Sequence, residues 1–185
     1  MPKQVIRDAE TRMEKAVEAT AKDFSSIRTG RASPSLVDNI QIDYYGTKSP
    51  IKQVATVTTP EPRLLVIQPW DKTIIKEIEK AITRSDLGLN PNSDKNVIRL
   101  TIPQLTEERR KSLAKHVRKL AEDGRNAVRN IRRDANNAIK KLERSSEISE
   151  DESRMRQDEI QEITDLYIEE INELLKAKEE ELLEL

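Results

Sequence analysis

The chain contains no cysteine, a single histidine and few aromatic residues, which make up 3% of its length. Without cysteine there is no disulfide framework, no thiolate nucleophile and no cysteine metal site. One imidazole, that of His116, cannot build a multi-histidine metal site, and we expect it to pack at the border of an apolar stripe. No Ser-His-Asp arrangement is signalled, and no G-x-x-x-x-G-K-[ST] loop is present for nucleotide phosphates. We therefore expect no enzyme, no metal and no cofactor.

Long hydrophobic runs are also missing. No apolar run approaches the ~20 residues that a membrane-spanning helix needs, and the start, Met1 to Gln4, lacks the apolar core of a signal peptide. The sequence predicts a soluble, cytoplasmic protein with no membrane partner.

Charge is abundant instead, at 36% of the residues, and with so few aromatics this composition is typical of long, solvated helices. Apolar residues recur at helical spacing over 3–28, over 106–144 and again from Ser149, where Glu152 three residues on completes a capping-box pattern. In the second helix the predicted apolar stripe is formed by residues at steps of three, four or seven: Leu113, Val117, Leu120, Ala127, Ile131, Ala135, Ala138 and Leu142. Gly124 in this helix indicates close helix packing, with a bend as the alternative.

Between the first two helices, the segment 31–104 changes character. Strand-like alternation over 40–44 is followed by Gly46, further β-rich runs cover 51–59 and 63–68, and a last strand is predicted over 97–102. Asp71 can cap a short helix whose buried side carries isoleucines. Trp70 is expected to anchor the core of this unit, with partner contact as the alternative.

The predicted fold is mainly α with an inserted α+β domain: an elongated three-helix bundle plus a small β/α/β domain. The bundle is discontinuous and takes residues 1–30 and 105–185, while residues 31–104 form the insert. Two chain crossings, near Arg31 and near Gln104, join the parts and should permit rotation about one axis. The hinge residues that we expect there are Arg28, Gly30, Arg31, Pro34, Pro103, Gln104, Leu105 and Thr106.

A second stripe in the helix 106–144 is basic. Lys111, Arg118, Arg125, Arg129 and Arg132 also fall at steps of seven, seven, four and three, roughly opposite the apolar stripe, and Arg133 is adjacent. Arginine makes forked contacts to phosphate, and only Asp134 appears close by in the sequence. The absence of interleaved aromatics favours recognition of backbone and shape over base stacking, a mode that suits structured RNA.

A structural explanation of the same charges stays open. Residues 107–144 carry 13 basic and 6 acidic side chains, a net charge of +7, whereas 145–185 carry 4 and 15, a net charge of −11. Neighbouring helices of opposite sign attract each other. The rival hypothesis is therefore a helical scaffold whose charges select partner helices, and sedimentation would separate it from a monomeric factor. An unrecognised hydrolase is the third and least supported alternative.

Five motifs in order resemble the family of bacterial ribosome recycling factors. They are RTGRASP at 28–34, TPEP at 59–62, QPWD at 68–71, DLGLNP at 86–91 and LTEERR at 105–110. The resemblance covers the whole chain, and five motifs in the right order are far more specific than any one of them.

The resemblance implies an L-shaped protein of tRNA-like dimensions, with a three-helix bundle and a hinged smaller domain. It implies binding to the A-site region of the post-termination ribosome, where elongation factor G and GTP help to separate the subunits and release mRNA and tRNA. Arginines of the family's bundle contact large-subunit ribosomal RNA, and the matching residues are Arg110, Arg129 and Arg132, with Arg133 adjacent. Together with the basic stripe, the expected RNA-binding set is Arg110, Arg118, Arg125, Arg129, Arg132 and Arg133, in a monomeric protein.

Overall fold

The computed structural model describes residues 1–183 and divides them into two compact units. One unit combines Met1–Thr29 with the chain from Glu107 onward, and the other holds Gly30–Thr106. The last two residues of the expected bundle domain, 184–185, lie outside the described residues. The fold class predicted from the sequence, helical with an inserted α+β unit, is confirmed.

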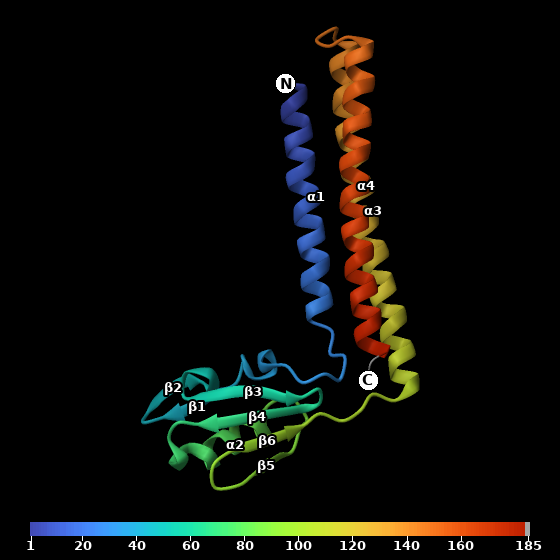
Figure 1. The fold of residues 1–185 in the computed structure, drawn as a ribbon. Coiled ribbons are helices and arrows are strands. Elements are labelled where there is room, and N and C mark those ends of the chain that lie inside the picture. The colour runs from blue at the N-terminus through green and yellow to red at the C-terminus, as the bar shows by residue number, and fades with distance from the viewer. Residues whose placement is uncertain (184–185) are drawn as a thin grey trace. The chain divides into compact units, whose positions relative to one another are not determined.

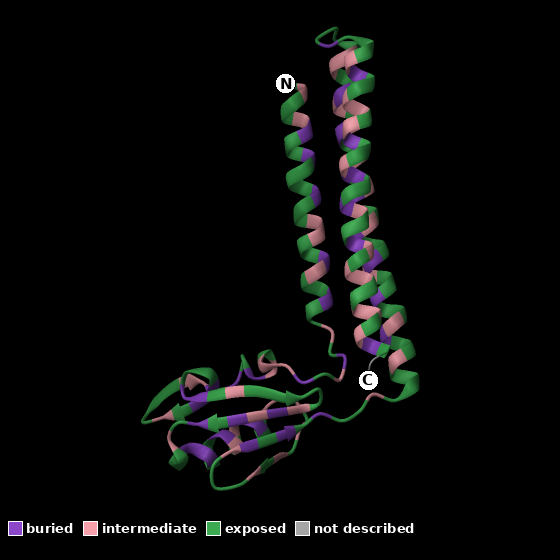
Figure 2. Cartoon of the chain, in the orientation of Figure 1, coloured by how far each residue is buried: buried purple, intermediate pink, exposed green. Residues whose placement is uncertain are grey.

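The first unit is a bundle of three long helices, α1 (Pro2–Ser25), α3 (Glu107–Arg144) and α4 (Glu150–Leu183), and each of them contacts the other two (Figure 1). Each helix turns one line of buried residues inward, with half-buried residues beside it and exposed residues on the outer side (Figure 2). The core lies along the bundle axis, where Met13, Val117, Ile160 and Ile171 are fully buried.

The end of α1 differs from the sequence prediction, and the start of α4 agrees with it. The first helix was predicted to run to residue 28 but ends at Ser25. The N–H of Ile27 donates to the carbonyl oxygen of Phe24 instead of that of Asp23, and the Ser26 hydroxyl satisfies the Asp23 carbonyl at 2.7 Å. At α4 the predicted cap is confirmed, because the backbone N–H of Glu152 donates to Ser149 Oγ at 3.1 Å.

The second unit is built from two small antiparallel sheets and one helix. The strands β1 (Gln41–Tyr44) and β2 (Thr47–Pro50) form a hairpin whose turn, Tyr45–Gly46, has positive φ angles of 50° and 80°. The second sheet has the order β3-β4-β6-β5 and contains β3 (Ala55–Glu61), β4 (Leu64–Pro69), β5 (Pro91–Ser93) and β6 (Ile98–Thr101). Its register shifts between Thr58 and Glu61, where Pro60 interrupts the ladder.

The helix of this unit, α2 (Ile75–Arg84), buries Ile75, Ile78 and Ile82 as the sequence predicts. Asp71 does cap, but it caps a short 3₁₀ turn, Lys72–Ile74, that precedes α2: its Oδ1 accepts from the backbone N–H of Thr73 at 3.0 Å. The core isoleucines of α2 pack in one cluster with residues of both sheets, including Ile42, Leu65 and Ile98.

Three expectations for this unit are wrong. Strand β5 was predicted as loop, because Pro91, Asn92 and Ser93 have loop composition; they form an edge strand only by pairing with β6. The run predicted as a strand from residue 51 begins at Ala55, after a 3₁₀ turn. Trp70 does not anchor the core: it is 68% exposed, and its Nε1–H donates to Thr56 Oγ1 at 3.1 Å.

Candidate nucleic-acid interface

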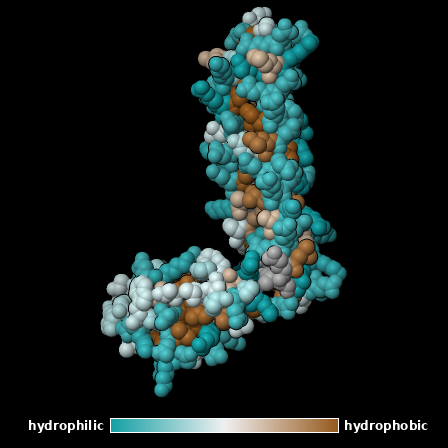
Figure 3. All heavy atoms as spheres, in the orientation of Figure 1, coloured by the Kyte–Doolittle hydropathy of each residue, from teal (hydrophilic) through white to brown (hydrophobic). Residues whose placement is uncertain are grey.

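Helix α3 carries the candidate arginines, and its packing decides which of their faces solvent can reach. The buried residues of α3 are Leu113, Val117, Ala121, Gly124, Val128, Ile131, Ala135 and Ile139. The predicted apolar stripe was partly right: Leu113, Val117, Ile131 and Ala135 are buried, whereas the other predicted members lie half-buried beside this line. Hydrophilic side chains cover most of the visible bundle surface, with narrow apolar patches between them (Figure 3).

Gly124 lets the three helices approach closely, which confirms the packing explanation. A Cβ atom at this position would overlap Thr20 Oγ1 of α1 and would lie 3.3 Å from Ile171 Cδ1 of α4. The buried line of α3 is therefore fixed in rotation against both neighbours at this level. The arginines that follow Gly124 in the sequence take their directions from this constraint.

The predicted position of the basic stripe, opposite the apolar stripe, is wrong for Arg125, Arg129 and Arg132, whereas Lys111 and Arg118 are exposed. Arg125 directly follows buried Gly124, and Arg132 directly follows buried Ile131, so both flank the buried line and are half-buried. Arg129 is half-buried as well, and Arg133 alone among these four is exposed. The stripe therefore borders the interface between helices instead of pointing away from it.

Glu122 holds two of these guanidinium groups. Its carboxylate accepts from Arg125 Nε at 2.9 Å and from Arg129 Nη1 at 3.0 Å. These two hydrogen bonds lower the pKa of Glu122 below its ordinary value, and the bond from Arg125 has the larger effect. Arg125 also donates to Asn172 Oδ1 of α4 at 2.8 Å, and its side chain is only 18% exposed. Arg125 thus fastens α3 to α4 and is largely withdrawn from solvent.

Arg132 and Arg133 keep their charge uncompensated at short range. Arg132 Nη1 donates to the neutral Gln161 Oε1 of α4 at 3.1 Å, and Arg133 Nη1 donates to the neutral Asn130 Oδ1 at 3.5 Å. Within residues 1–183 neither guanidinium has a carboxylate at ion-pair distance. Asp134, which the sequence suggested as their neighbour, pairs instead with Arg12 of α1 at 3.1 Å.

The other two candidates lie nearer the start of α3. Arg118 Nε donates to Glu179 Oε1 of α4 at 2.6 Å, yet its side chain stays 67% exposed. Arg110 is half-buried, and both arginines line a hollow of about 270 Å³ between the start of α3 and the end of α4. The six candidates therefore do not form one uniform surface, since Arg118, Arg125 and Arg129 are tied to carboxylates of the bundle.

The expected hinge residues are found at the two places where the chain passes between the units. Arg28 belongs to the helical unit, and the other seven, Gly30, Arg31, Pro34, Pro103, Gln104, Leu105 and Thr106, belong to the β-containing unit. Gly30 has φ +80°, and a Cβ there would lie 3.1 Å from Leu105 Cγ, so the two crossing segments touch within that unit. Next to it in the sequence, buried Thr29 donates its hydroxyl to Glu181 Oε1 of α4 at 2.7 Å.

Sequence reasoning missed the side chains that orient the arginines. Glu122 stands three and seven residues before its two partners, which is helical spacing, so this pair of contacts could have been found from the sequence. Gln161 and Asn172 lie on another helix, and their roles depend on the register between α3 and α4. His116 is exposed, so its expected packing role is wrong.

Among residues 1–183 there is no cluster of three or more His, Cys, Asp or Glu side chains placed to hold a metal ion. None of the helices described in this range is long and apolar enough to cross a membrane.

Comparisons with known proteins agree over nearly the whole chain. The family model described as ribosome recycling factor matches residues 20–183. The ribosome-recycling factors of Halothermothrix orenii and Syntrophomonas wolfei are 57% and 56% identical over 185 residues, and each match covers all of both chains.

Solved structures give the same result. A solution structure of a ribosome recycling factor matches with a TM-score of 0.76 at 45% identity, covering 100% of this chain and 98% of that one. A second match, with a TM-score of 0.66, 45% identity and 99% coverage of both chains, is the T. thermophilus ribosome recycling factor described together with E. coli elongation factor G bound to the E. coli post-termination complex.

Proposed function

The chain belongs to the ribosome recycling factor family, and from this premise we propose that α3 docks it on large-subunit ribosomal RNA near the A site of the post-termination ribosome. Elongation factor G, with GTP, then promotes separation of the subunits and release of mRNA and tRNA. In this proposal the chain is a monomeric cytoplasmic factor that binds and positions, and elongation factor G supplies the energy.

One observation carries the proposal for the RNA contact. Arg132 and Arg133 are adjacent, reach solvent and donate only to neutral amide oxygens at 3.1 and 3.5 Å. Within residues 1–183 neither guanidinium has a carboxylate at ion-pair distance, and a phosphodiester accepts forked hydrogen bonds from guanidinium groups. Arg129, at 38% exposure and shared with Glu122, can contribute a free edge to the same phosphates.

Arg125 takes a different part in this proposal. Its two partners, Glu122 and Asn172, occupy its Nε and Nη1 donors, and most of its side chain is covered. We assign it the positioning of α3 against α4, with the RNA contact made by its neighbours. Arg118 and Arg110 extend the basic surface toward the start of α3.

The test is equilibrium binding to ribosomes, read by sedimentation or filter retention, for three variants. Arg133→Glu should weaken binding tenfold or more and leave the melting temperature nearly unchanged, because within residues 1–183 its side chain makes only one hydrogen bond, a long one to Asn130. Arg7→Glu makes the same charge change on an exposed residue of α1 and should have a much smaller effect. Arg125→Ala should mainly lower the free energy of unfolding, by about 1–3 kcal/mol, since it removes the hydrogen bonds to Glu122 and Asn172 from a largely covered side chain.

Equal binding of the Arg133→Glu and wild-type chains would remove the proposed RNA contact. The salt dependence gives a second reading: four phosphate contacts predict a slope of about −3 to −4 in log affinity against log salt. The rival scaffold predicts weak ribosome binding and self-association through the basic and acidic helices. A dimer in analytical ultracentrifugation, with no ribosome affinity, would support that rival.

A further inference from the structure

A second basic surface lies on the β-containing unit, whereas the candidate arginines of α3 belong to the helical unit. Helix α2 buries Ile75, Ile78 and Ile82, and its outer side carries Lys76, Lys80 and Arg84 at steps of four residues. Cations at this spacing are neighbours on the helix surface and repel each other. Arg84 and Lys76 have no carboxylate at ion-pair distance within residues 1–183, and Lys80 Nζ lies 3.8 Å from Glu77 Oε1.

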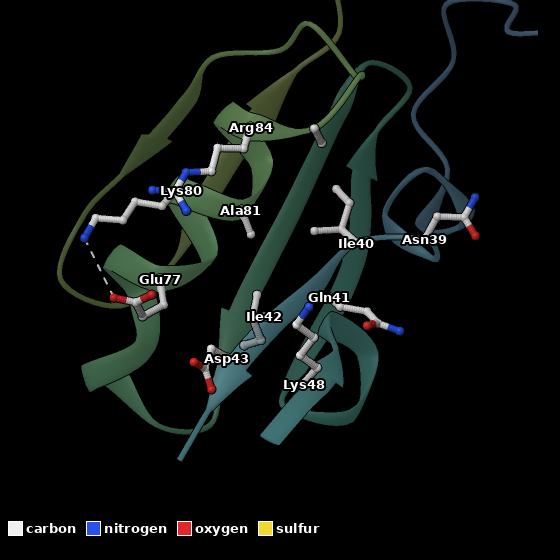
Figure 4. A pocket seen from close by; sticks show the side chains of 11 residues that line it. Asn39, Ile40, Gln41, Ile42, Asp43, Lys48, Glu77, Lys80, Ala81 and Arg84 are labelled. Atoms are coloured by element: carbon white, nitrogen blue, oxygen red, sulfur yellow. Dashed lines mark ion pairs between the residues drawn. The ribbon is translucent and has the colours of Figure 1, made fainter. Parts of the chain in front are cut away.

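Two hollows flank this row of cations and share Lys80 and Arg84. The first, of about 370 Å³, lies between α2 and β1 (Figure 4). Ala81 of α2 and Ile42 of β1 line it, together with Lys48 of β2. The second, of about 470 Å³, lies on the other side, toward Asn90 and Pro91. An extended ligand can therefore pass over the ridge formed by Lys80 and Arg84 and find a depression on each side.

The charges around the first hollow are arranged unevenly. Asp43 and Glu77 lie at one end of the hollow, and Arg84 starts from the other end of α2 with its guanidinium group turned toward Lys80 (Figure 4). Lys48 is the cross-strand partner of Asp43, so these two charges offset each other. What remains is Arg84, which has no carboxylate at ion-pair distance within residues 1–183, beside the Lys80–Glu77 pair, with the neutral amides of Asn39 and Gln41 also lining the hollow.

We infer that this surface binds an RNA strand, with a backbone phosphate on Lys80 and Arg84 and a ribose 2′-hydroxyl donating to Asp43 or Glu77. Phosphate suits the ridge because a guanidinium and an ammonium group donate there side by side. Ribose suits the acidic end because a carboxylate accepts from the 2′-hydroxyl that distinguishes RNA from DNA. The inference rests on the proposed function, which brings the chain to ribosomal RNA, and adds a second contact from the other unit.

The test uses the full chain and purified ribosomes. Because the chain has no cysteine, the substitution Asn39→Cys gives a single attachment point in the wall of the first hollow for an iron–EDTA group that releases hydroxyl radicals. Asn39 is exposed and its side chain makes no hydrogen bond within residues 1–183, so the substitution should not disturb the fold. We expect strand scission at a limited set of ribosomal RNA positions.

The charge variant Lys80→Ala/Arg84→Ala should abolish this scission and reduce the salt slope of ribosome affinity by about 1 to 2. The matched control, Lys72→Ala/Lys95→Ala, removes two exposed cations of the same unit that line neither hollow, and should leave the scission pattern intact.

Three outcomes would overturn the inference: no scission from the tethered iron–EDTA group, scission that survives the loss of Lys80 and Arg84, or weaker binding of that variant without any RNA scission, which would indicate a protein partner. The proposed function is judged separately by Arg133→Glu. If that variant loses affinity while the tethered group cuts nothing, only the second contact fails. If the wild-type chain does not bind ribosomes, the proposed function itself fails.

Discussion

The close approach at Gly124 leads to a prediction about the stability of the bundle. In an ordinary helix interior, Gly→Ala stabilises by about 1 kcal/mol. Here the new Cβ would overlap Thr20 Oγ1, and Thr20 cannot easily turn away, because its side chain is branched at Cβ and its hydroxyl donates to Ala16 O at 3.0 Å. Overpacking of this kind costs about 1–3 kcal/mol. Gly124→Ala should therefore lower the free energy of unfolding by about 1 kcal/mol.

Thr20→Ala removes the Oγ1 atom that the new Cβ would overlap, and so provides a background in which Gly124→Ala can be measured without this overlap. In that background Gly124→Ala should stabilise by about 1 kcal/mol, so the two substitutions should couple by about 2 kcal/mol. Urea unfolding of the four chains, followed by circular dichroism in the far ultraviolet, measures the cycle. If Gly124→Ala changed stability by the same amount in both backgrounds, the contact between α1 and α3 at Thr20 would not be what requires glycine.

Two further predictions concern the β-containing unit. Gly30→Ala should lower the free energy of unfolding more than Gly46→Ala. Both glycines have φ +80° and cost roughly 1–2 kcal/mol to replace, but only Gly30 lies against Leu105. Equal losses in urea unfolding would argue against the contact. Hydrogen bonds from the backbone of Asn96 and Val97 and from Arg99 lower the pKa of Asp94 to about 2, so its stabilising effect should be complete above about pH 4 and fade as the pH falls toward 2. Asp94→Asn should flatten the acid limb of stability over that window, and an unchanged limb would show that Asp94 does not contribute.

The helices could be predicted because apolar residues recur every 3.6 residues over a long stretch of each one. Ile6, Val117 and Ile160 are buried, as this periodicity predicts. Short elements were harder. Strand β5 exists only because β6 pairs with it, and nothing in Pro91, Asn92 and Ser93 indicates a strand on its own. Trp70 shows the limit of reasoning from residue type, since a large apolar ring usually packs inside, whereas this ring is exposed and its Nε1–H donates to Thr56.

The candidate site was predictable in its residues but not in its geometry. The spacing of arginines on the 106–144 helix pointed to a basic surface, yet the rotation of α3 is set by contacts with two other helices, and a small rotation decides whether a guanidinium faces solvent or a neighbour. That is why Arg125 and Arg133, both assigned to RNA from the sequence, differ so strongly in exposure.

The discontinuous bundle has a consequence for the order in which the chain can fold during synthesis. Helix α1 is made first, but the residues that cover Met13 and Phe24 belong to α3 and α4, which follow only after the whole β-containing unit. That unit can complete its own core while the apolar residues of α1 are still exposed to solvent. A nascent chain with an uncovered amphipathic helix is expected to bind chaperones.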